Sequence, residues 1–240
     1  MDNGKKTRTL FNERSFKFQI NIKVNNKEKS KIILRILNKI YPKVPIPLNY
    51  KNTFTLLVSV LLSAQCTDVN VNNVTKNIYS KYNQPQHFVK LGRRKIEKLI
   101  NKIGIFRVKA KSIYYLSKIL VNSYNSKVPK TYEELEKLPG VGHKTASVVM
   151  SQGFGFPAFP VDTHIHRLAQ RWGLSNGKNV IQTEKDLKYI FPKKHWNKLH
   201  LQIIWYGREY CKARECYGIT CKICKSCYPN RKKVIKTKKA

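Results

Sequence analysis

The chain has 240 residues, enough for one large or two modest folded domains with a sizeable core. It contains 48 lysine and arginine residues against 13 aspartate and glutamate residues, a formal net charge of +35 at pH 7. A field of this sign favours polyanions such as nucleic acid, although a genome with biased base composition could produce the same excess. No stretch of about 18 apolar residues is present, so we expect no membrane-spanning helix.

The N-terminal part divides into a basic arm and a first helix. Residues 1–27 are basic but lack the apolar segment of a secretory signal, and we interpret them as an arm. Residues 27–40 carry isoleucine and leucine at helical spacing. The three prolines within residues 41–47 cannot continue that helix, which indicates a boundary there.

The rest of the chain has helical periodicity and no convincing strand alternation or internal repeat. Residues 54–64 are apolar on all sides and predict a buried core helix. The further expected helices are 69–79, 93–102, 109–124, a short one from 131, then 143–152, 163–172, 184–191 and 194–206. The sequence therefore predicts an all-α fold.

A glycine-rich turn separates two of these helices near the middle of the chain. Thr131 and Glu134 have the spacing of a capping box, and the helix that they begin runs into Gly140, Val141 and Gly142. Two glycines around one apolar residue favour a tight hairpin whose N–H groups face outward. A helix that begins after such a turn can bind an anion, here a nucleic-acid phosphate, although a plain helical hairpin is the simpler reading.

Lys144 and Asp162 add a chemical possibility to this hairpin. Lys144 lies at the start of the second helix, where the dipole disfavours a cation and favours the neutral amine. Asp162 follows 18 residues later, after an extended loop with prolines. A neutral amine attacks carbonyl or anomeric carbons, and a nearby carboxylate can relay its proton. Alternatively, Lys144 only meets phosphate and Asp162 only caps the next helix.

The segment LPGVGHKTASVVM, followed by VDTHIHRLAQRWGL, resembles the helix-hairpin-helix, Gly/Pro-rich loop and aspartate of the endonuclease III family. The resemblance implies a bifunctional DNA glycosylase and AP lyase, with Lys144 as nucleophile and Asp162 as catalytic aspartate. His143 stands where the family usually carries arginine, which we expect to alter a phosphate or packing contact rather than the chemistry. DNA contacts are expected from Gly140, Val141, Gly142, His143 and His164.

Two further segments carry the same resemblance. Residues 63–68 resemble the family's L-S-A-Q-x-T-D segment, which implies that Gln65 enters the hole left by an extruded base. Residues 103–110 are similar to its I-G-x-x-x-x-K-A loop, which implies that Ile105 is a wedge in the base stack. The alternatives are a polar residue in a helix corner for Gln65 and a helix-capping contact for Ile105.

The resemblance also implies a domain arrangement. Residues 46–156 would form a six-helix barrel that ends in the helix-hairpin-helix. Residues 28–45 would pack with residues 157–230 in an iron–sulfur domain, and residues 231–240 would be a basic tail. Lys144 and Asp162 would then face each other across the cleft between the two domains.

Five of the six cysteines lie within residues 211–227, which in an intracellular protein favours a metal site. The family binds a [4Fe–4S] cluster through C-x6-C-x2-C-x5-C, whereas this chain reads C-x4-C-x4-C-x2-C-x2-C. We expect ligation by Cys211, Cys221, Cys224 and Cys227, with Cys216 as a spare or substitute. Zinc is the less favoured alternative, and a loop without metal is the least.

The loop has basic residues besides its cysteines. Lys212 and Arg214 are expected to contact phosphate and to hold the loop against DNA.

The function implied is removal of damaged, chiefly oxidised, pyrimidines from double-stranded DNA by a monomer that resides inside the cell with the DNA. Strand cleavage 3′ to the abasic site would follow by β-elimination. An adenine-mismatch glycosylase lacks the lysine, and an 8-oxoguanine lyase lacks the cysteine loop. A non-catalytic helix-hairpin-helix DNA-binding protein is the alternative from another class.

Overall fold

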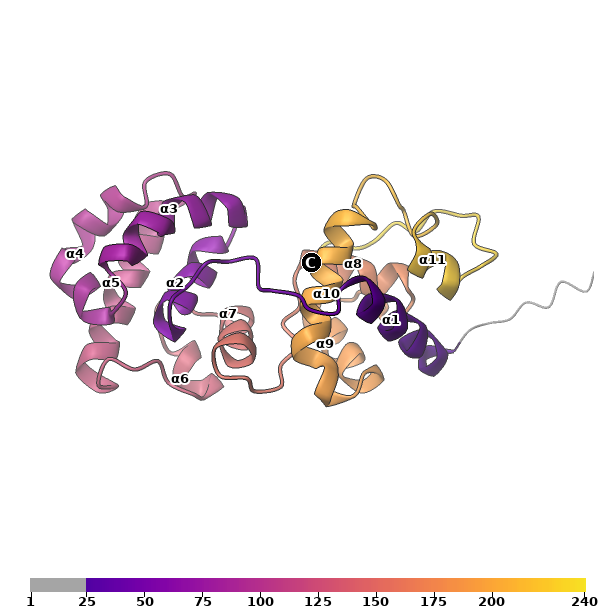
Figure 1. Ribbon diagram of the computed structural model, residues 1–240, viewed down its shortest axis with the longest axis horizontal. Coiled ribbons are helices and arrows are strands. Elements are labelled where there is room, and N and C mark those ends of the chain that lie inside the picture. The colour runs from indigo at the N-terminus through magenta and orange to yellow at the C-terminus, as the bar shows by residue number, and fades with distance from the viewer. Residues whose placement is uncertain (1–24) are drawn as a thin grey trace, which may run out of the picture.

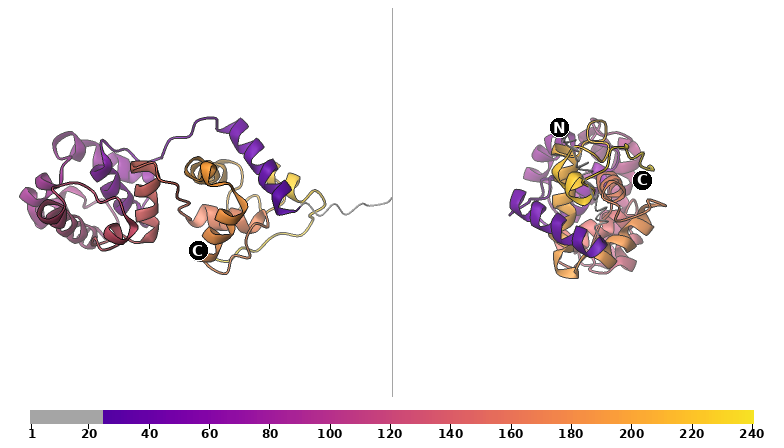
Figure 2. Two further views of the ribbon diagram at one scale, coloured as in Figure 1. Left: turned by 90° about the horizontal axis from the view of Figure 1, so that it is seen from below. Right: turned by 90° about the vertical axis from the view of Figure 1, so that its right-hand side faces the viewer.

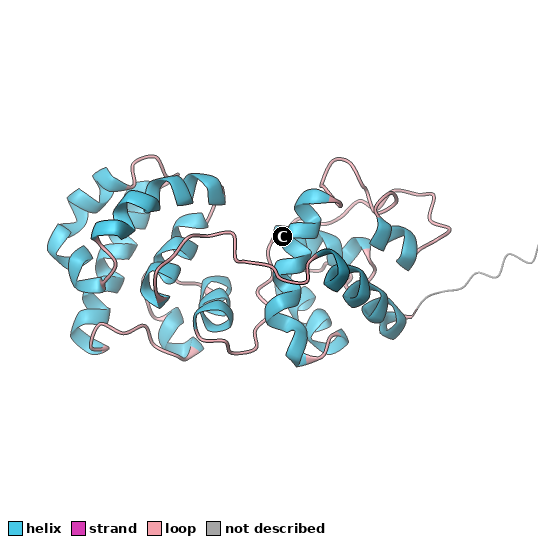
Figure 3. Cartoon of the chain, viewed as in Figure 1, coloured by secondary structure: helices cyan, strands magenta, loops and turns pink. Residues whose placement is uncertain are grey.

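The computed structural model describes residues 25–240, so nearly all of the predicted N-terminal arm (residues 1–27) lies outside the described residues. The helices gather into two lobes at opposite ends of an elongated molecule (Figure 1). Throughout the described range the chain forms helices and loops and no strand, which confirms the all-α prediction (Figure 3). Within the same range, no helix combines the length and apolar character needed to cross a bilayer.

The first lobe contains helices α2 to α7 and a single π-helical turn, η1. Their bounds are α2 (Thr53–Ser63), α3 (Asp68–Lys81), α4 (Pro85–Leu99), α5 (Phe106–Ser123), α6 (Tyr132–Glu136), α7 (His143–Val148) and η1 (Val149–Gly153). The second lobe contains α1 and α8 to α11. Their bounds are α1 (Asn26–Ile40), α8 (Thr163–Arg171), α9 (Val180–Ile190), η2 (Lys193–His195), α10 (Trp196–Glu209) and α11 (Lys222–Cys227).

Helix α2 forms the centre of the first lobe. Every residue from 54 to 62 is buried, and Leu56, Leu57 and Leu62 have no exposed surface. Its polar positions are satisfied internally, since Ser59 Oγ lies 2.8 Å from the hydroxyl of Tyr79. The predicted buried core helix is thus confirmed, and the other helices of this lobe surround it.

Helix α1 closes the second lobe although more than 100 residues separate it from its partners. Ile33 and Leu37 are fully buried in one core with Trp172 and Tyr206. Figure 2 shows α1 running alongside α10 and α11, with which it is in contact. The second core is therefore completed by a segment that precedes the whole first lobe in the chain.

Several side chains join the two lobes where the chain passes between them. Arg208 of α10 forms an ion pair with Asp68 at the start of α3, with 2.6 Å between Nη2 and Oδ2. Asn197 of α10 donates to the carbonyl of Gly155, in the loop after η1, at 3.1 Å. Trp205 donates to the carbonyl of Pro45, in the segment that links α1 to α2, at 3.2 Å. These contacts set the orientation of the lobes around the cleft between them.

Some helix boundaries differ from the sequence prediction for local reasons. Helix α4 is interrupted at Gly92, whose φ of 70° and ψ of 160° are open to glycine but not to other residues. Helix α9 begins at Val180 because the Asn179 side chain accepts from the N–H of Gln182 at 2.8 Å. The expected helix 143–152 ends as a π-helical turn after Val148, and α11 was not predicted.

We predict that acid destabilises the protein partly through His200 of α10. Its side chain is 1% exposed, and burial lowers its pKa to about 4. The folded protein keeps His200 neutral, whereas the unfolded chain protonates it below about pH 6.5. Stability is therefore lost as pH falls from about 6.5 towards 4, by on the order of 3 kcal/mol at most.

The free energy of urea-induced unfolding should accordingly fall less on acidification for His200→Gln than for the wild type. The other histidines stay in place in both proteins, so the difference isolates His200. If the free energy of unfolding falls equally with pH in both proteins, the prediction is contradicted.

Candidate active site and cysteine cluster

A cavity of about 670 Å³ lies between the two lobes and is lined by residues from both. The first lobe contributes the loop between α2 and α3 and the start of α7. The second lobe contributes the loop that leads into α8 and one side of α10. The lining residues include Gln65, Asp68, Lys144, Asp162, His164, His200 and Arg208.

Lys144 reaches this cavity from the hairpin that precedes α7. At Gly140 the φ angle is 79°, and a Cβ atom there would lie 2.8 Å from Cβ of Ser112. Only glycine allows this approach of the hairpin to α5. The Val141 side chain is 5% exposed and anchors the hairpin in the first core. Exposed Lys144 follows directly in the first turn of α7.

The backbone of the hairpin differs from expectation at one position. The N–H of Val141 donates to the carbonyl of Leu138 at 3.1 Å, which closes the turn. The expectation that this N–H faces outward is therefore wrong, because the tight turn needs the bond itself. Gly142 is the N-cap of α7, has an extended backbone and is exposed.

His143 makes contacts within the protein, one of the two kinds of contact expected at this position of the motif. Its Nδ1 lies 2.8 Å from a carboxylate oxygen of Glu136, and its Nε2 lies 3.4 Å from one of Glu184. The ring also stacks on Tyr132 with 5.4 Å between centroids. His143 thus links the hairpin to α9 of the second lobe.

Asp162 lies at the N-terminus of α8 and also borders the cavity. Its Oδ1 accepts from the N–H of Ile165 at 2.8 Å, so it caps the helix as a structural reading of the sequence also predicted. The two readings do not exclude each other, since one oxygen caps the helix while the carboxylate still lines the cavity. The cap fixes the position of this charge.

His164 lies beside Asp162 in the cavity wall. Burial lowers its pKa, Asp162 opposes that shift, and the cations Arg167, Arg208 and Lys144 lower it further. Nη2 of Arg167 lies 3.3 Å from Nδ1 of His164, and a guanidinium can only donate. His164 is therefore a neutral ring that accepts at Nδ1.

The structure places Gln65 and Ile105 on two adjacent loops. Gln65 lines the cavity, whereas Ile105 projects from the N-cap of α5 with 55% of its surface exposed. Both have left-handed backbone conformations, with φ of 53° and 51°. Such conformations are uncommon for residues other than glycine and cluster at functional sites.

Four cysteines come together in the second lobe. The Sγ atoms of Cys211, Cys216, Cys221 and Cys224 all lie within 4.8 Å of one another, and the four residues are buried. Such a group of thiols could hold a metal ion. The N–H of Cys221 lies 3.4 Å from Sγ of Cys216, and N–H groups directed at sulfur favour the thiolates that metals bind.

This group differs from the expected ligand set at one position, where Cys216 replaces Cys227. The loop between Cys211 and Cys221 turns back on itself and brings Cys216 inward, within 3.9 Å of Sγ of Cys224. Cys227 ends α11 and is 1% exposed in the second core, but it is not part of the group. The group thus contains Cys216 where Cys227 was expected, and the identity of the metal ligands stays a prediction.

Two arginines of α8 hold the cysteine loop, and the sequence analysis missed both. Arg171 is 2% exposed and donates to the carbonyls of Lys212 and Ala213 at 2.8 Å and to Sγ of Cys211 at 3.3 Å. Arg167 donates to the carbonyl of Cys211 at 3.1 Å. Among 48 basic residues, only their four-residue spacing on one helix could have indicated a shared role.

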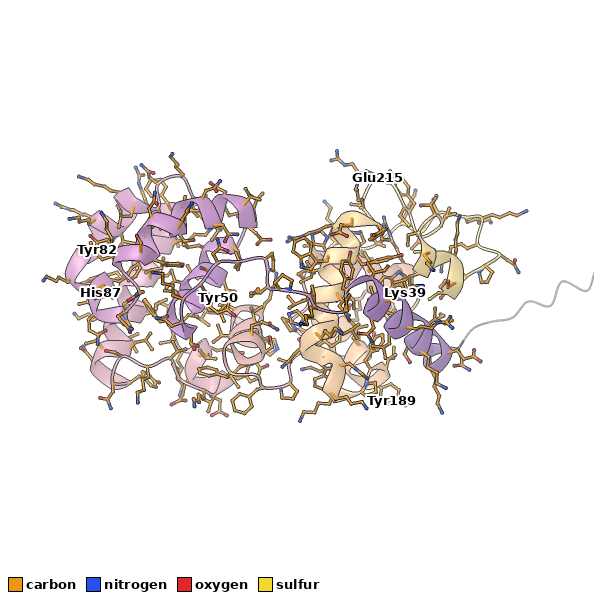
Figure 4. The ribbon with its side chains drawn as sticks, in the orientation of Figure 1. Lys39, Tyr50, Tyr82, His87, Tyr189 and Glu215 are labelled. Carbon is orange, nitrogen blue, oxygen red and sulfur yellow. The ribbon has the colours of Figure 1, made fainter. Side chains whose placement is uncertain are left out.

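The basic residues predicted on the loop, Lys212 and Arg214, are both exposed. Lys212 forms an ion pair with Glu215, with 3.1 Å between Nζ and Oε1. Figure 4 places Glu215 at the outer edge of the second lobe, where this loop faces solvent.

Comparison with known proteins identifies the family. Residues 58–193 match the model of the HhH-GPD superfamily of base excision DNA repair proteins. Endonuclease III of Rickettsia prowazekii is 44% identical over 183 residues, which cover 76% of this chain and 86% of that protein. Endonuclease III of Escherichia coli K12 is 40% identical over 190 residues, which cover 79% of this chain and 90% of that protein.

Solved structures agree with these relatives. A trapped covalent intermediate of endonuclease III with DNA superposes with a TM-score of 0.77 at 39% identity, over 83% of this chain and 97% of that one. A non-covalent endonuclease III–DNA complex gives the same TM-score at 40% identity and the same coverage. By sequence and by fold, the chain belongs to the endonuclease III family within the HhH-GPD superfamily of base excision DNA repair proteins.

Proposed function

We propose that this protein is a bifunctional DNA glycosylase and AP lyase that removes damaged, chiefly oxidised, pyrimidines from duplex DNA. The observation that carries the proposal is the cavity between the lobes, which Lys144 borders from one lobe and Asp162 from the other. Relatives known as endonuclease III, one of them in a trapped covalent complex with DNA, support the same chemistry. The net charge of +35 suits a DNA ligand.

The reaction takes place on a nucleotide that has left the base stack. Extrusion costs least where damage has already weakened pairing, and the cavity receives the flipped nucleotide. The neutral amine of Lys144 attacks C1′ of the deoxyribose and the damaged base departs with its electron pair. Asp162 stabilises the positive charge that develops on the sugar and accepts the lysine proton.

The C1′–O4′ bond then breaks, O4′ leaves with its electron pair and takes a proton, and the opened sugar is joined to Lys144 as a Schiff base at C1′. Strand cleavage follows from this Schiff base. The iminium acidifies the hydrogen on C2′, whose removal expels the 3′ phosphate and breaks the strand 3′ to the lesion. Hydrolysis of the imine then returns the free amine.

The two cores support a division into two domains with the predicted boundaries. One core is built from residues between 48 and 150, and the other joins residues 33–37 to residues 159–227. We assign residues 46–156 to the barrel domain and residues 28–45 with 157–230 to the second domain. The enzyme acts as a monomer, and the hairpin, His164, Lys212 and Arg214 contact the DNA.

The cysteine group is proposed to bind a [4Fe–4S] cluster, with zinc as the less favoured alternative. Cys211, Cys216, Cys221 and Cys224 would hold it, since four buried thiols within 4.8 Å fit such a group. A bound cluster would connect the four cysteines and so hold the loop in one conformation. The chain's own part is to keep Lys212 and Arg214 on a fixed backbone, which Arg167 and Arg171 of α8 support.

A non-catalytic DNA-binding protein with the same hairpin is the second candidate. It would need Lys144 only as a phosphate contact, and it gives no reason for Asp162 to border the same cavity. An adenine-mismatch glycosylase would not need a lysine at this position.

Borohydride trapping on abasic duplex DNA should crosslink the wild-type protein, because the reagent reduces a lysine imine to a stable amine. Lys144→Ala should abolish the crosslink. Lys137→Ala removes the same charge from the exposed end of α6 beside the hairpin and serves as the matched control. It should retain most of the crosslink. A wild type that fails to trap would refute the lyase.

Asp162→Asn should bind abasic duplex DNA normally but cleave it about a hundredfold more slowly, since a proton-transfer group typically contributes that much or more. Asparagine caps helices as well as aspartate, so its amide oxygen can still accept from Ile165 and α8 should remain folded. Binding is measured by gel shift and cleavage by single-turnover kinetics. An unchanged cleavage rate would remove Asp162 from the mechanism.

Purified protein should be brown and contain iron and acid-labile sulfide. Cys216→Ser should lose most of both, because it removes a member of the thiol group, whereas Cys227→Ser should keep them. Metal and sulfide analysis per chain measures the difference. If Cys227→Ser loses iron and sulfide while Cys216→Ser keeps them, the ligand set expected from the sequence is the right one. A colourless protein that contains zinc would contradict the iron–sulfur cluster.

A further inference from the structure

Two exposed loops of the first lobe lie against each other beside the cavity. One joins α2 to α3 and carries Gln65, and the other precedes α5 and carries Ile105. A Cβ atom on Gly104 would lie 3.6 Å from the carbonyl oxygen of Gln65, so the two loops pass close to each other. The left-handed conformations of Gln65 and Ile105 need support from their surroundings.

That support comes from a buried lysine that the proposed reaction does not use. Lys109 of α5 is 4% exposed, and its Nζ donates to the carbonyls of Leu62 at 2.9 Å and Ala64 at 2.6 Å. Both carbonyls lie at the C-terminal end of α2, where they lack helical partners and where the dipole favours a cation. Lys109 therefore caps α2 directly before Gln65.

The same lysine is fixed to the second loop through its backbone. Its N–H donates to the carbonyl of Ile105 at 3.2 Å, in the first turn of α5. One residue thus holds the backbone of Ile105 with its amide and the backbone before Gln65 with its ammonium. Burial lowers the pKa of Lys109, because removing the ammonium from water disfavours its charged form.

A second side chain ties the same loops together. Nδ2 of Asn70, in the first turn of α3, donates to the carbonyl of Lys102 at 2.9 Å and lies 3.3 Å from Sγ of Cys66. Asn70 therefore joins the residue after Gln65 to the loop that leads to Ile105. The two loops are therefore connected twice, by Lys109 of α5 and by Asn70 of α3.

We infer that Lys109 is a positioning residue that locks Gln65 and Ile105 into a single two-pronged element which enters the base stack of a duplex as one unit. The inference rests on the proposed function and deepens it. The ligand is the stacked bases on either side of an extruded nucleotide. Ile105 would separate the stacked bases, and Gln65 would fill the gap that the extruded base leaves. Both must enter the duplex together, because an unfilled gap lets the extruded base return and without the wedge the stack does not open.

The test is a fluorescence measurement that needs no cleavage. A duplex carries a stable abasic analogue with 2-aminopurine next to it, and unstacking by the bound protein raises the fluorescence. At saturating protein, Lys109→Met should reduce the rise about tenfold, because a displaced wedge no longer offsets the cost of unstacking. Methionine keeps most of the length of the side chain but leaves both carbonyls without a donor. The matched control is Lys111→Met, which removes the same charge from an exposed site on the same helix.

Trapping on single-stranded abasic DNA provides the second readout, because a single strand needs no wedge. Lys109→Met should trap it within about twofold of wild type and trap the duplex about tenfold less. In a Gln65→Ala, Ile105→Ala background, adding Lys109→Met should change neither the fluorescence nor the duplex-to-single-strand ratio. A further drop in that background, or equal losses on both substrates, would overturn the inference.

The two readouts also separate this inference from the proposed lyase activity. If the wild-type protein unstacks the duplex but never forms a borohydride crosslink, the lyase activity is refuted. The fluorescence of Lys109→Met against wild type then still tests the role of Lys109. Should Lys109→Met fail to fold, Asn70→Ala removes the other tether from a partly exposed site and should lower the fluorescence rise as well. A rise equal to that of wild type in Asn70→Ala would then contradict the two-pronged element.

Discussion

The site between the lobes depends on helix α8 being held at both of its ends. Asp162 caps its first turn, and from later turns Arg167 and Arg171 donate to the backbone of the cysteine loop. Because the Asp162 carboxylate accepts from the N–H of Ile165, its position is fixed relative to α8. The cysteine loop can therefore influence the cavity through α8 without taking part in the chemistry, and Asp162 stays opposite the lobe that carries Lys144.

Two buried cations of this protein, Lys109 and Arg171, donate to backbone carbonyls rather than to carboxylates. The chain has 13 acidic residues for 48 basic ones, so most cations cannot find a carboxylate partner. The ammonium of Lys109 caps the C-terminal end of α2, and Arg171 donates to the cysteine loop; both residues are at most 4% exposed. A buried charge must be paired or hydrogen-bonded, and unpartnered carbonyls at a helix end or in a loop meet that need. The exposed cations remain free to attract DNA.

The cysteine loop shows where reasoning from the sequence reached its limit. Five cysteines in 17 residues predicted a metal site, and the structure brings four of them together. The resemblance to the family's C-x6-C-x2-C-x5-C pattern favoured Cys227 over Cys216, because Cys221 and Cys224 match its central pair and Cys227 then follows as the last ligand. The loop instead turns back before Cys221, and the carbonyl contacts of Arg171 stabilise that turn. Those contacts come from a helix about 40 residues earlier in the chain.

The sequence by itself determined the features that depend on neighbouring residues. Apolar periodicity specified the helices, the mostly apolar segment specified the buried α2, and Gly140 with Gly142 specified the hairpin before Lys144. The family resemblance already placed Lys144 opposite Asp162, and the structure brings both to one cavity. The tertiary structure alone decided two other distant pairings, Lys109 with the end of α2 and Cys216 with Cys224. The reason is that helix formation follows from local spacing, whereas these pairings depend on how two cores pack and on loops whose path no local pattern encodes.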